Sequence, residues 1–97
     1  MIPVKRLEIV IDAPHAERVT RILAARGFDG WTVLRNASGF GDRGQRQDDG
    51  ISSVSSNQVI VTTCPPERLD EVIEELRSLL ARVGGVCLVS DAHWLLH

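Results

Sequence analysis

Alternation of apolar and polar side chains predicts four β-strands. In the first, residues 4–11, the apolar positions are separated by Lys5, Arg6 and Glu8, a spacing typical of a strand with one buried face. β-Branched and aromatic side chains favour three more strands, at about residues 30–37, 58–63 and 86–92. After the last of these strands, residues 93–97 are expected to form a short apolar tail.

Two stretches with apolar residues three and four positions apart predict amphipathic helices. Seven apolar side chains follow this spacing over residues 69–83, which gives one continuous apolar stripe. The earlier stretch follows Asp12, a residue suited to the N-cap, and has Pro14 in its first turn, where no backbone N–H is needed. Glycines at position 27 and at positions 84–85 favour an end to each helix.

The order of these elements is strand, helix, strand, then a long loop, then strand, helix, strand. Two such split βαβ units favour an α+β fold, a ferredoxin-like βαββαβ sandwich with two helices on one antiparallel sheet. We therefore expect one domain over residues 1–97. The helices reach only one face of the sheet, so the other face, which also carries apolar side chains, needs a cover that self-association would supply.

The long loop, residues 38–57, separates the second and third predicted strands and is expected to be mobile. It contains four glycines and five serines, and its only apolar side chains are Phe40, Ile51 and Val54. Loops of this length in small domains are uncommon and are usually functional or disordered. The segment is therefore the strongest candidate for a functional site.

Residues 39–44, Gly-Phe-Gly-Asp-Arg-Gly, follow the second predicted strand directly. Glycines let the backbone approach a ligand closely and turn consecutive N–H groups toward an anion. Arg43 and Arg46 can each bind a phosphate through two hydrogen bonds. A flexible loop without a ligand explains the same glycines, and the Walker A and Rossmann patterns are both absent.

Two further pairs of residues are candidates for the same site. Gly84 and Gly85 precede the last predicted strand, where they form either a plain helix cap or part of a ligand loop. Thr62 and Thr63 end the third predicted strand, and a hydroxyl or backbone group there could contact an adenine edge, although β-propensity alone also explains them. In this fold, the loop after the second strand and the turn before the last one can reach the same subunit edge, where a neighbour would complete a cleft.

Composition narrows the class of protein. The 97 residues carry a net charge of −2, with 43% hydrophobic and 25% charged residues, which is ordinary for one folded soluble domain. The absence of a basic excess argues against a nucleic-acid partner. No apolar run is long enough to cross a bilayer, and the first residues lack the pattern of a secretory signal, so we expect a cytoplasmic protein that is not inserted in a membrane.

No motif for catalysis is present, since the patterns HExxH, CxxC and GxSxG are all missing. We therefore expect that the protein is not an enzyme, with weak nucleotide hydrolysis as the remaining enzymatic alternative. A rival class is a ferredoxin-like trimer similar to the copper-tolerance proteins, which would bind metal rather than nucleotide. In that case Cys64, Cys87, His93 and His97 would be the residues that matter.

Three short motifs, in order and with fitting spacing, resemble the PII signalling family. They are Gly-Trp-Thr-Val at residues 30–33, Gly-Phe-Gly at residues 39–41 and Pro-Glu-Arg-Leu-Asp-Glu-Val-Ile at residues 66–73. The resemblance covers nearly the whole chain. It implies a homotrimer with its sheets facing inward, adenine nucleotides in three clefts between subunits, and a T-loop at about residues 38–57 that senses the ligand and docks onto a protein target.

The resemblance also implies roles for individual residues. Thr32 and Thr63 would lie near the adenine, residues 39–41 would wrap the nucleotide, and residues 84–86 would stand in for the family's B-loop. None of these positions is expected to be catalytic or to bind metal. Together with the residues chosen from the pattern, the candidate nucleotide-binding residues are Thr32, Gly39, Phe40, Gly41, Asp42, Arg43, Arg46, Thr62, Thr63, Gly84, Gly85 and Val86.

Departures from the family's pattern indicate which members of the family the chain resembles most. The chain has no tyrosine, so the family's uridylylated tyrosine is absent, and Arg43 stands where the family has a glutamine. The B-loop lysine and the C-terminal arginines are also missing, which implies weaker binding of ATP phosphates. The chain looks most like the carboxysome-associated PII-like proteins, which implies ADP or AMP as ligand, bicarbonate as co-ligand, and a target such as a bicarbonate transporter or a carboxysome component.

Overall fold

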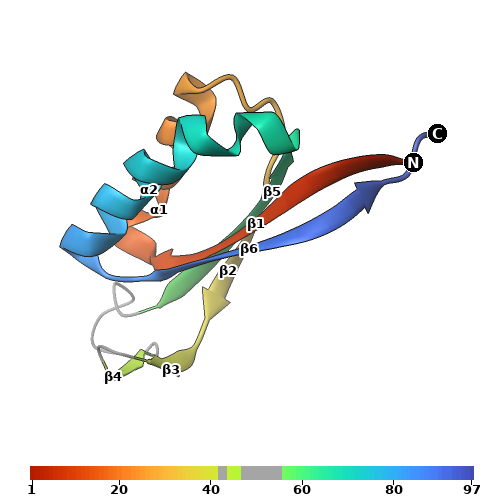
Figure 1. Cartoon of the computed structure of the whole chain (residues 1–97). Coiled ribbons are helices and arrows are strands. Elements are labelled where there is room, and N and C mark those ends of the chain that lie inside the picture. The colour runs from red at the N-terminus through yellow and green to blue at the C-terminus, as the bar shows by residue number, and fades with distance from the viewer. Residues whose placement is uncertain (42–43, 47–55) are drawn as a thin grey trace.

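The computed structural model of the chain describes residues 1–41, 44–46 and 56–97, and Figure 1 shows a sheet with two helices on one side. All four predicted strands and both predicted helices are present. The elements in chain order are β1 (Ile2–Asp12), α1 (Ala13–Ala25), β2 (Thr32–Ala37), β3 (Gly39–Gly41), β4 (Gly44–Arg46), β5 (Asn57–Cys64), the 3-10 turn η2 (Pro66–Arg68), α2 (Leu69–Val83) and β6 (Val86–Trp94).

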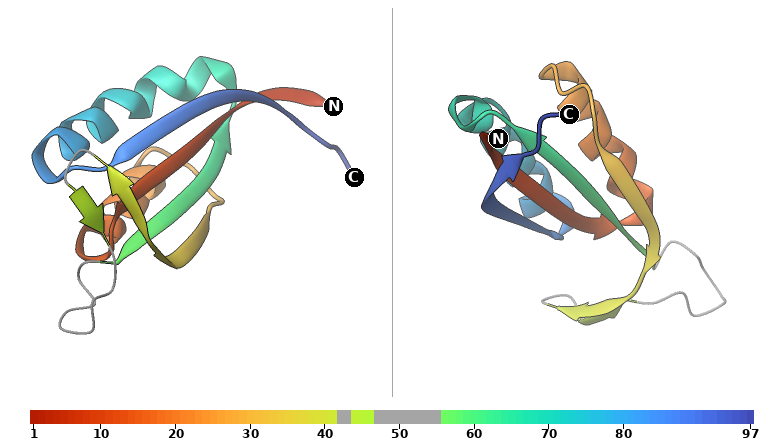
Figure 2. Two further views of the ribbon diagram at one scale, coloured as in Figure 1. Left: turned by 90° about the horizontal axis from the view of Figure 1, so that it is seen from below. Right: turned by 90° about the vertical axis from the view of Figure 1, so that its right-hand side faces the viewer.

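The four long strands form one antiparallel sheet in the order β2–β5–β1–β6. Both helices lie against the same face of this sheet, and in the described part of the chain the opposite face carries no helix (Figures 1 and 2). The predicted ferredoxin-like sandwich is therefore confirmed. Its strand order leaves β2 and β6 at the two edges of the sheet.

The hydrophobic core lies between the sheet and the helices. Because side chains alternate between the two faces of a strand, Leu7, Ile9 and Ile11 of β1 all point toward the helices, and all three are buried. Burial of an aliphatic side chain of this size contributes roughly 1.5–3 kcal/mol. The helices cover these residues with Ala16, Val19 and Leu23 of α1 and with Val72, Leu76 and Leu79 of α2.

Specific contacts fix the ends of the helices. Asp12 holds the N-cap position of α1, and its Oδ1 lies 2.7 Å from Nδ1 of His15. After α1, Gly27 has φ +84°, a conformation that favours glycine, and Arg26 Nε donates a hydrogen bond of 3.0 Å to Glu75 Oε1 of α2. Neither of the two helices that the structure describes is both long enough and apolar enough to cross a bilayer.

β1 and β6 run further than the sequence pattern predicts and form a two-stranded arm. Their register pairs Ile2 with Trp94, whereas β5 ends at Cys64, opposite Lys5. Figure 1 shows the arm ending at the two chain termini. The prediction of a tail over residues 93–97 is therefore wrong for its first two residues, because pairing with the start of β1 extends the strand.

The segment predicted as one long loop contains a pair of short strands. β3 pairs with β4, with Gly39 opposite Arg46 and Gly41 opposite Gly44, and Asn57 belongs to β5. Backbone pairing in a glycine-rich hairpin requires no alternation of apolar side chains, so the sequence pattern carried no signal for it. The rest of the predicted loop, residues 42–43 and 47–55, lies outside the described residues.

The core position of Leu76 gives a direct test of this packing. Leu76→Ala removes a fully buried side chain of α2, and we expect a loss of about 2–5 kcal/mol in the free energy of unfolding because a cavity remains. The exposed Leu95 is the matched control, and Leu95→Ala should change stability by less than about 0.5 kcal/mol. Chemical denaturation measures both, and equal effects would contradict the assigned core.

Candidate functional site

Both glycine segments singled out in the sequence lie at the same end of the sheet. β2 finishes there with Ala37 paired to Asn57, and β6 begins there with Val86 paired to Val10. β3 follows β2 after one residue, and the turn at positions 84–85 comes directly before β6. This end of the sheet therefore carries the base of the predicted T-loop and the turn after α2 (Figure 1).

The turn after α2 has a backbone that requires glycine. Gly84 is buried, has φ +86°, and its N–H donates to the Leu80 carbonyl at 2.8 Å, which ends the helix. Gly85 has φ +112°, and a Cβ placed on it would lie only 2.6 Å from the Val10 carbonyl oxygen. The turn is thus a helix cap seated against β1, and Val86 leaves it with its side chain largely exposed.

Thr32 and Thr63 lie on the face of the sheet that turns away from the helices. Thr32 pairs with Val61, and Thr63 pairs with Arg6, one position along β1 from the buried Leu7. Since side chains alternate along strands, both threonines share the open face. Thr32 is exposed and Thr63 is half-buried.

Thr62 lies on the opposite, helix-covered face. It is buried, and its hydroxyl donates a hydrogen bond of 2.6 Å to the Gly30 carbonyl oxygen. This bond holds the chain just before β2 against β5. The side chain of Thr62 therefore supports the position of Thr32, while that of Thr63 faces outward.

One copy of the chain does not bring these residues into one cleft. Thr63 and Val86 pair with Arg6 and Val10, and these positions of β1 are about 13 Å apart at a strand rise of about 3.3 Å per residue. β2 and β6, which carry Thr32 and Val86, are separated by three strand spacings, or about 14 Å. A small ligand that touches both groups would need a second copy.

The remaining predicted site residues belong to the T-loop segment. Phe40 and Gly41 lie in β3 and Arg46 lies in β4, and in Figure 2 these short strands stand apart from the four-stranded sheet. Asp42 and Arg43 lie outside the described residues. The described part of the segment thus leaves the sheet at its glycine-bearing end.

The open face of the sheet exposes large apolar side chains. Leu34 of β2 is 55% exposed, and Val86 and Leu88 of β6 are 54% and 58% exposed. Exposed apolar residues gathered on one face mark a surface that packs against something else. The uncovered face expected from the sequence is therefore present, and it lies beside both edges that carry candidate site residues.

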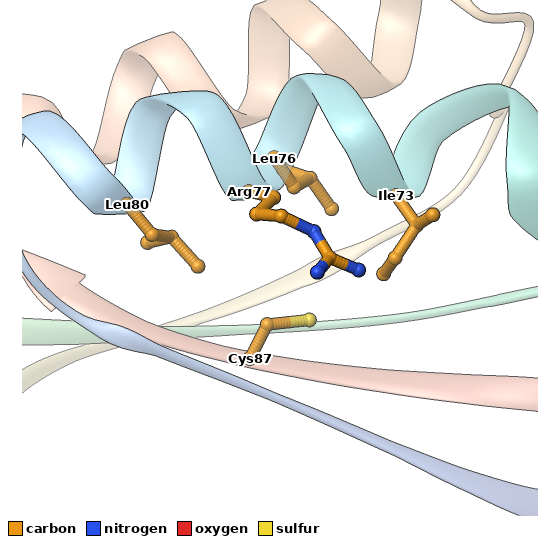
Figure 3. A pocket seen from close by; sticks show the side chains of 5 residues that line it. All are labelled: Ile73, Leu76, Arg77, Leu80 and Cys87. Atoms are coloured by element: carbon orange, nitrogen blue, oxygen red, sulfur yellow. The ribbon is translucent and has the colours of Figure 1, made fainter.

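A separate hollow, which the sequence did not indicate, lies between α2 and β6 on the helix side of the sheet. It measures about 200 Å³ and is lined by Ile73, Leu76, Arg77, Leu80 and Cys87 (Figure 3). Typical ligand pockets span roughly 300–1,000 Å³, so this hollow is small for a nucleotide. It contains none of the predicted nucleotide-binding residues.

The residues of the metal-binding alternative are spread along the sheet. Cys64 pairs with Lys5, Cys87 with Ile9, and His93 with Pro3 near the tip of the arm. Within the part of the chain that the structure describes, no three His, Cys, Asp or Glu side chains are grouped so that they could hold a metal ion. Nothing in the described geometry of one copy favours this alternative.

Comparison with known proteins gives a match over almost the whole chain. The model of one protein family, described as nitrogen regulatory protein P-II, matches residues 4–95. A search of curated proteins finds no match.

Several solved structures share the fold. A structure of CPII, a nitrogen regulatory PII-like protein from Thiomonas intermedia K12, bound to ADP, AMP and bicarbonate, superposes with a TM-score of 0.87 at 27% identity, covering 95% of this chain and 88% of that chain. The apo form of CPII gives a TM-score of 0.78 at 27% identity, over 95% and 91% of the two chains. A PII-like signaling protein from Thermus thermophilus, at 20% identity and a TM-score of 0.79 over 97% and 91%, shares the fold.

Gly85 provides a test of the turn that precedes β6. Gly85→Ala places a Cβ against the Val10 carbonyl in a left-handed conformation, and we expect a loss of at least about 1–3 kcal/mol in the free energy of unfolding. At Gly30 an added Cβ meets nothing within 4 Å, so Gly30→Ala should be nearly neutral. Similar stabilities for the two variants, measured by chemical denaturation, would show that the turn is not seated as described.

The two cysteines give a test of burial on the helix side. Burial raises the pKa of the Cys87 thiol, and it is also the main cause of the raised pKa of Cys64. Because only the thiolate reacts, alkylation by iodoacetamide at about pH 8 should be roughly tenfold or more slower in the folded chain than in the chain unfolded by urea. Mass spectrometry follows each site, and equal rates in the two states would contradict this placement.

Proposed function

This chain belongs to the nitrogen regulatory protein P-II family, and we propose that it is a regulator that binds ADP or AMP in clefts between three copies of itself. The observation that supports this most strongly is the superposition, with a TM-score of 0.87 over 95% of the chain, on CPII bound to ADP, AMP and bicarbonate. Residues 1–97 then form a single PII-like domain. It acts in the cytoplasm as a signalling protein rather than an enzyme.

The separation of the candidate residues supports a site between copies. In one copy Thr63 and Val86 are about 13 Å apart along β1, and Thr32 lies on β2, at the opposite edge of the sheet from β6. When the open faces of several copies pack together, the β2 edge of one copy can lie beside the β6 edge of the next. Thr32 and Thr63 would then face the turn at positions 84–85 of a neighbour across a narrow seam.

The phosphates would bind at the glycine-bearing end of the sheet. The C-terminal end of α2 carries a partial negative charge, so a phosphate beside Gly84 and Gly85 needs cations from another element. Arg43 and Arg46 in the T-loop segment can supply them through bidentate hydrogen bonds. The glycines of β3 let the backbone come close to the ligand.

The adenine would bind near the two outward-facing threonines. In this arrangement the Thr32 hydroxyl and the backbone around Thr63 contact the base, and Thr62 positions Thr32 through its bond to the Gly30 carbonyl. Val86 contributes an apolar contact from the neighbouring copy. The threonines would therefore contact the adenine, and the glycine-bearing end of the sheet would bind the phosphates.

The biological role follows from the ligands. We place bicarbonate beside the nucleotide phosphates as a co-ligand, which makes the protein a sensor of energy state and inorganic carbon. The T-loop, residues 38–57, would change its conformation according to which ligands are bound, and would thereby signal to a protein target such as a bicarbonate transporter or a carboxysome component. A ligand shifts such a signal only as far as it prefers one state of the loop.

Calorimetry with ADP and AMP, with and without bicarbonate, tests this function. We expect the wild-type chain to bind both, and Arg43→Ala to bind about 10–100-fold more weakly because a charge-assisted hydrogen bond to phosphate is worth about 1.5–3 kcal/mol. Arg18→Ala is the control, since Arg18 lies on the exposed side of α1, and it should bind like the wild type. If the wild-type chain binds no adenine nucleotide at millimolar concentration, the proposal is refuted.

A further inference from the structure

Arg68 occupies a position where a cation is ordinarily unfavourable. It holds the N-cap of α2, and its side chain makes no capping hydrogen bond. The N-terminal end of a helix carries a partial positive charge, and an N-cap usually holds Ser, Thr, Asp or Asn. Arginine is therefore disfavoured at this position by local structure, and contacts elsewhere in the fold are needed to offset the cost.

The contacts of the Arg68 side chain lie mainly on the turn between α1 and β2, residues 26–31. Its Nη2 donates a hydrogen bond to the Arg26 carbonyl oxygen. Its guanidinium carbon lies 5.7 Å from the centre of the Phe28 ring, a distance at which a cation is attracted to the face of the ring. Between these two residues, Gly27 has φ +84°, and a Cβ placed on it would lie 3.2 Å from Arg68 Nη2. Arg68 therefore packs closely against the first half of the turn.

The second half of the same turn is held from β5. The Thr62 hydroxyl donates a hydrogen bond of 2.6 Å to the Gly30 carbonyl oxygen, and Thr32, the first residue of β2, lies two positions further along the chain. Thr62 belongs to β5, and Arg68 follows the end of β5 by four residues. One continuous piece of chain thus holds both halves of the turn, so a shift of residues 26–28 is passed through Gly30 to Thr32.

Arg68 fixes the path of the turn more firmly than the other ion pair at this place does. Arg26 Nε also bonds to Glu75 Oε1 at 3.0 Å, but these two side chains are 45% and 43% exposed, and exposed ion pairs contribute little to stability. The Arg68 side chain is 35% exposed, and it bonds to a backbone carbonyl rather than to another long side chain. Its contact therefore acts on the backbone of the turn itself.

We infer that Arg68 is a positioning residue for the adenine part of the proposed site, because it holds the turn between α1 and β2 and thereby fixes the Thr32 hydroxyl. The inference rests on the proposed function, which places Thr32 at the adenine, and it adds a residue that touches no ligand itself. A hydroxyl that is already held in place loses less freedom when the base binds, which raises the affinity.

Calorimetry with ADP tests the effect of Arg68 on binding. Arg68→Gln removes the charge and shortens the side chain, and we expect ADP to bind about three- to tenfold more weakly, the range of one hydrogen bond. Arg77→Gln is the matched control on the same helix, because Arg77 is 70% exposed and its Nη2 lies 3.4 Å from Glu74 Oε1, on α2 itself. It should bind ADP like the wild type, and equal weakening in the two variants would overturn the inference.

A double-mutant cycle separates positioning of Thr32 from a general effect on the fold. Thr32→Val removes the hydroxyl and keeps the shape of the side chain, and it should also weaken ADP binding about three- to tenfold. Once that hydroxyl is absent, Arg68→Gln should cause little further loss. If Arg68 only stabilises the fold, Arg68→Gln lowers the affinity by the same factor with Thr32 or Val at this position, and that result would overturn the inference.

Hydrogen exchange shows directly whether Arg68 holds the turn. In Arg68→Gln, the backbone amides of residues 27–32 should exchange about tenfold faster than in the wild type, while those of β1 keep their rates. Unchanged exchange over residues 27–32 would overturn the inference. Circular dichroism verifies that the variants are folded. If Arg68→Gln does not fold, Arg68→Lys takes its place in every measurement, with an expected loss of about threefold, because lysine keeps the charge and lacks the planar fork of donors.

The same calorimetry distinguishes the two possible failures. If the wild type binds ADP and Thr32→Val weakens binding while Arg68→Gln does not, the inference about Arg68 fails and the proposed function stands. If Thr32→Val binds ADP as tightly as the wild type, the inference fails as well, because there is no contact for Arg68 to position. If the wild type binds no ADP at millimolar concentration, the proposed function fails, and with it the inference that depends on it.

Discussion

Two helices can cover only one face of a four-stranded sheet, and the rest of the structure depends on this limit. On the covered face, Leu7 and Ile9 are fully buried, while Leu34 and Leu88 on the other face are more than half exposed. A chain of 97 residues has no further element in its described part with which to shield that second face. Its apolar surface is therefore available to another molecule, and apolar burial is the dominant favourable term in association.

In the proposed function, the uncovered face also links assembly to ligand binding. The candidate contacts lie toward both edges of the sheet, with Thr32 on β2 and Val86 on β6, so a seam between copies is the place where they can act together. A ligand held at such a seam binds the assembled form in preference to the separate chains, and it stabilises the assembly by mass action.

Local periodicity predicted most of the fold, because the patterns of helices and strands depend on residues that are close together in the sequence. The stripe of α2 and the glycine after each helix are of this kind. The arm of β1 and β6 was missed, since it depends on Ile2 pairing with Trp94, far apart in sequence. For the site, the two-residue period of a strand already implied that Thr62 and Thr63 face opposite ways, but which of them faces outward depended on the packing of β5 against the helices.

Native mass spectrometry of the wild-type chain in the presence of ADP is the most direct measurement of the link between assembly and ligand. A nucleotide site at the seam between copies predicts an oligomer of three chains that carries bound ADP, together with separate chains that carry none. Separate chains that bind ADP as well as the oligomer does, or a chain that stays single and unliganded at millimolar ADP, would contradict it.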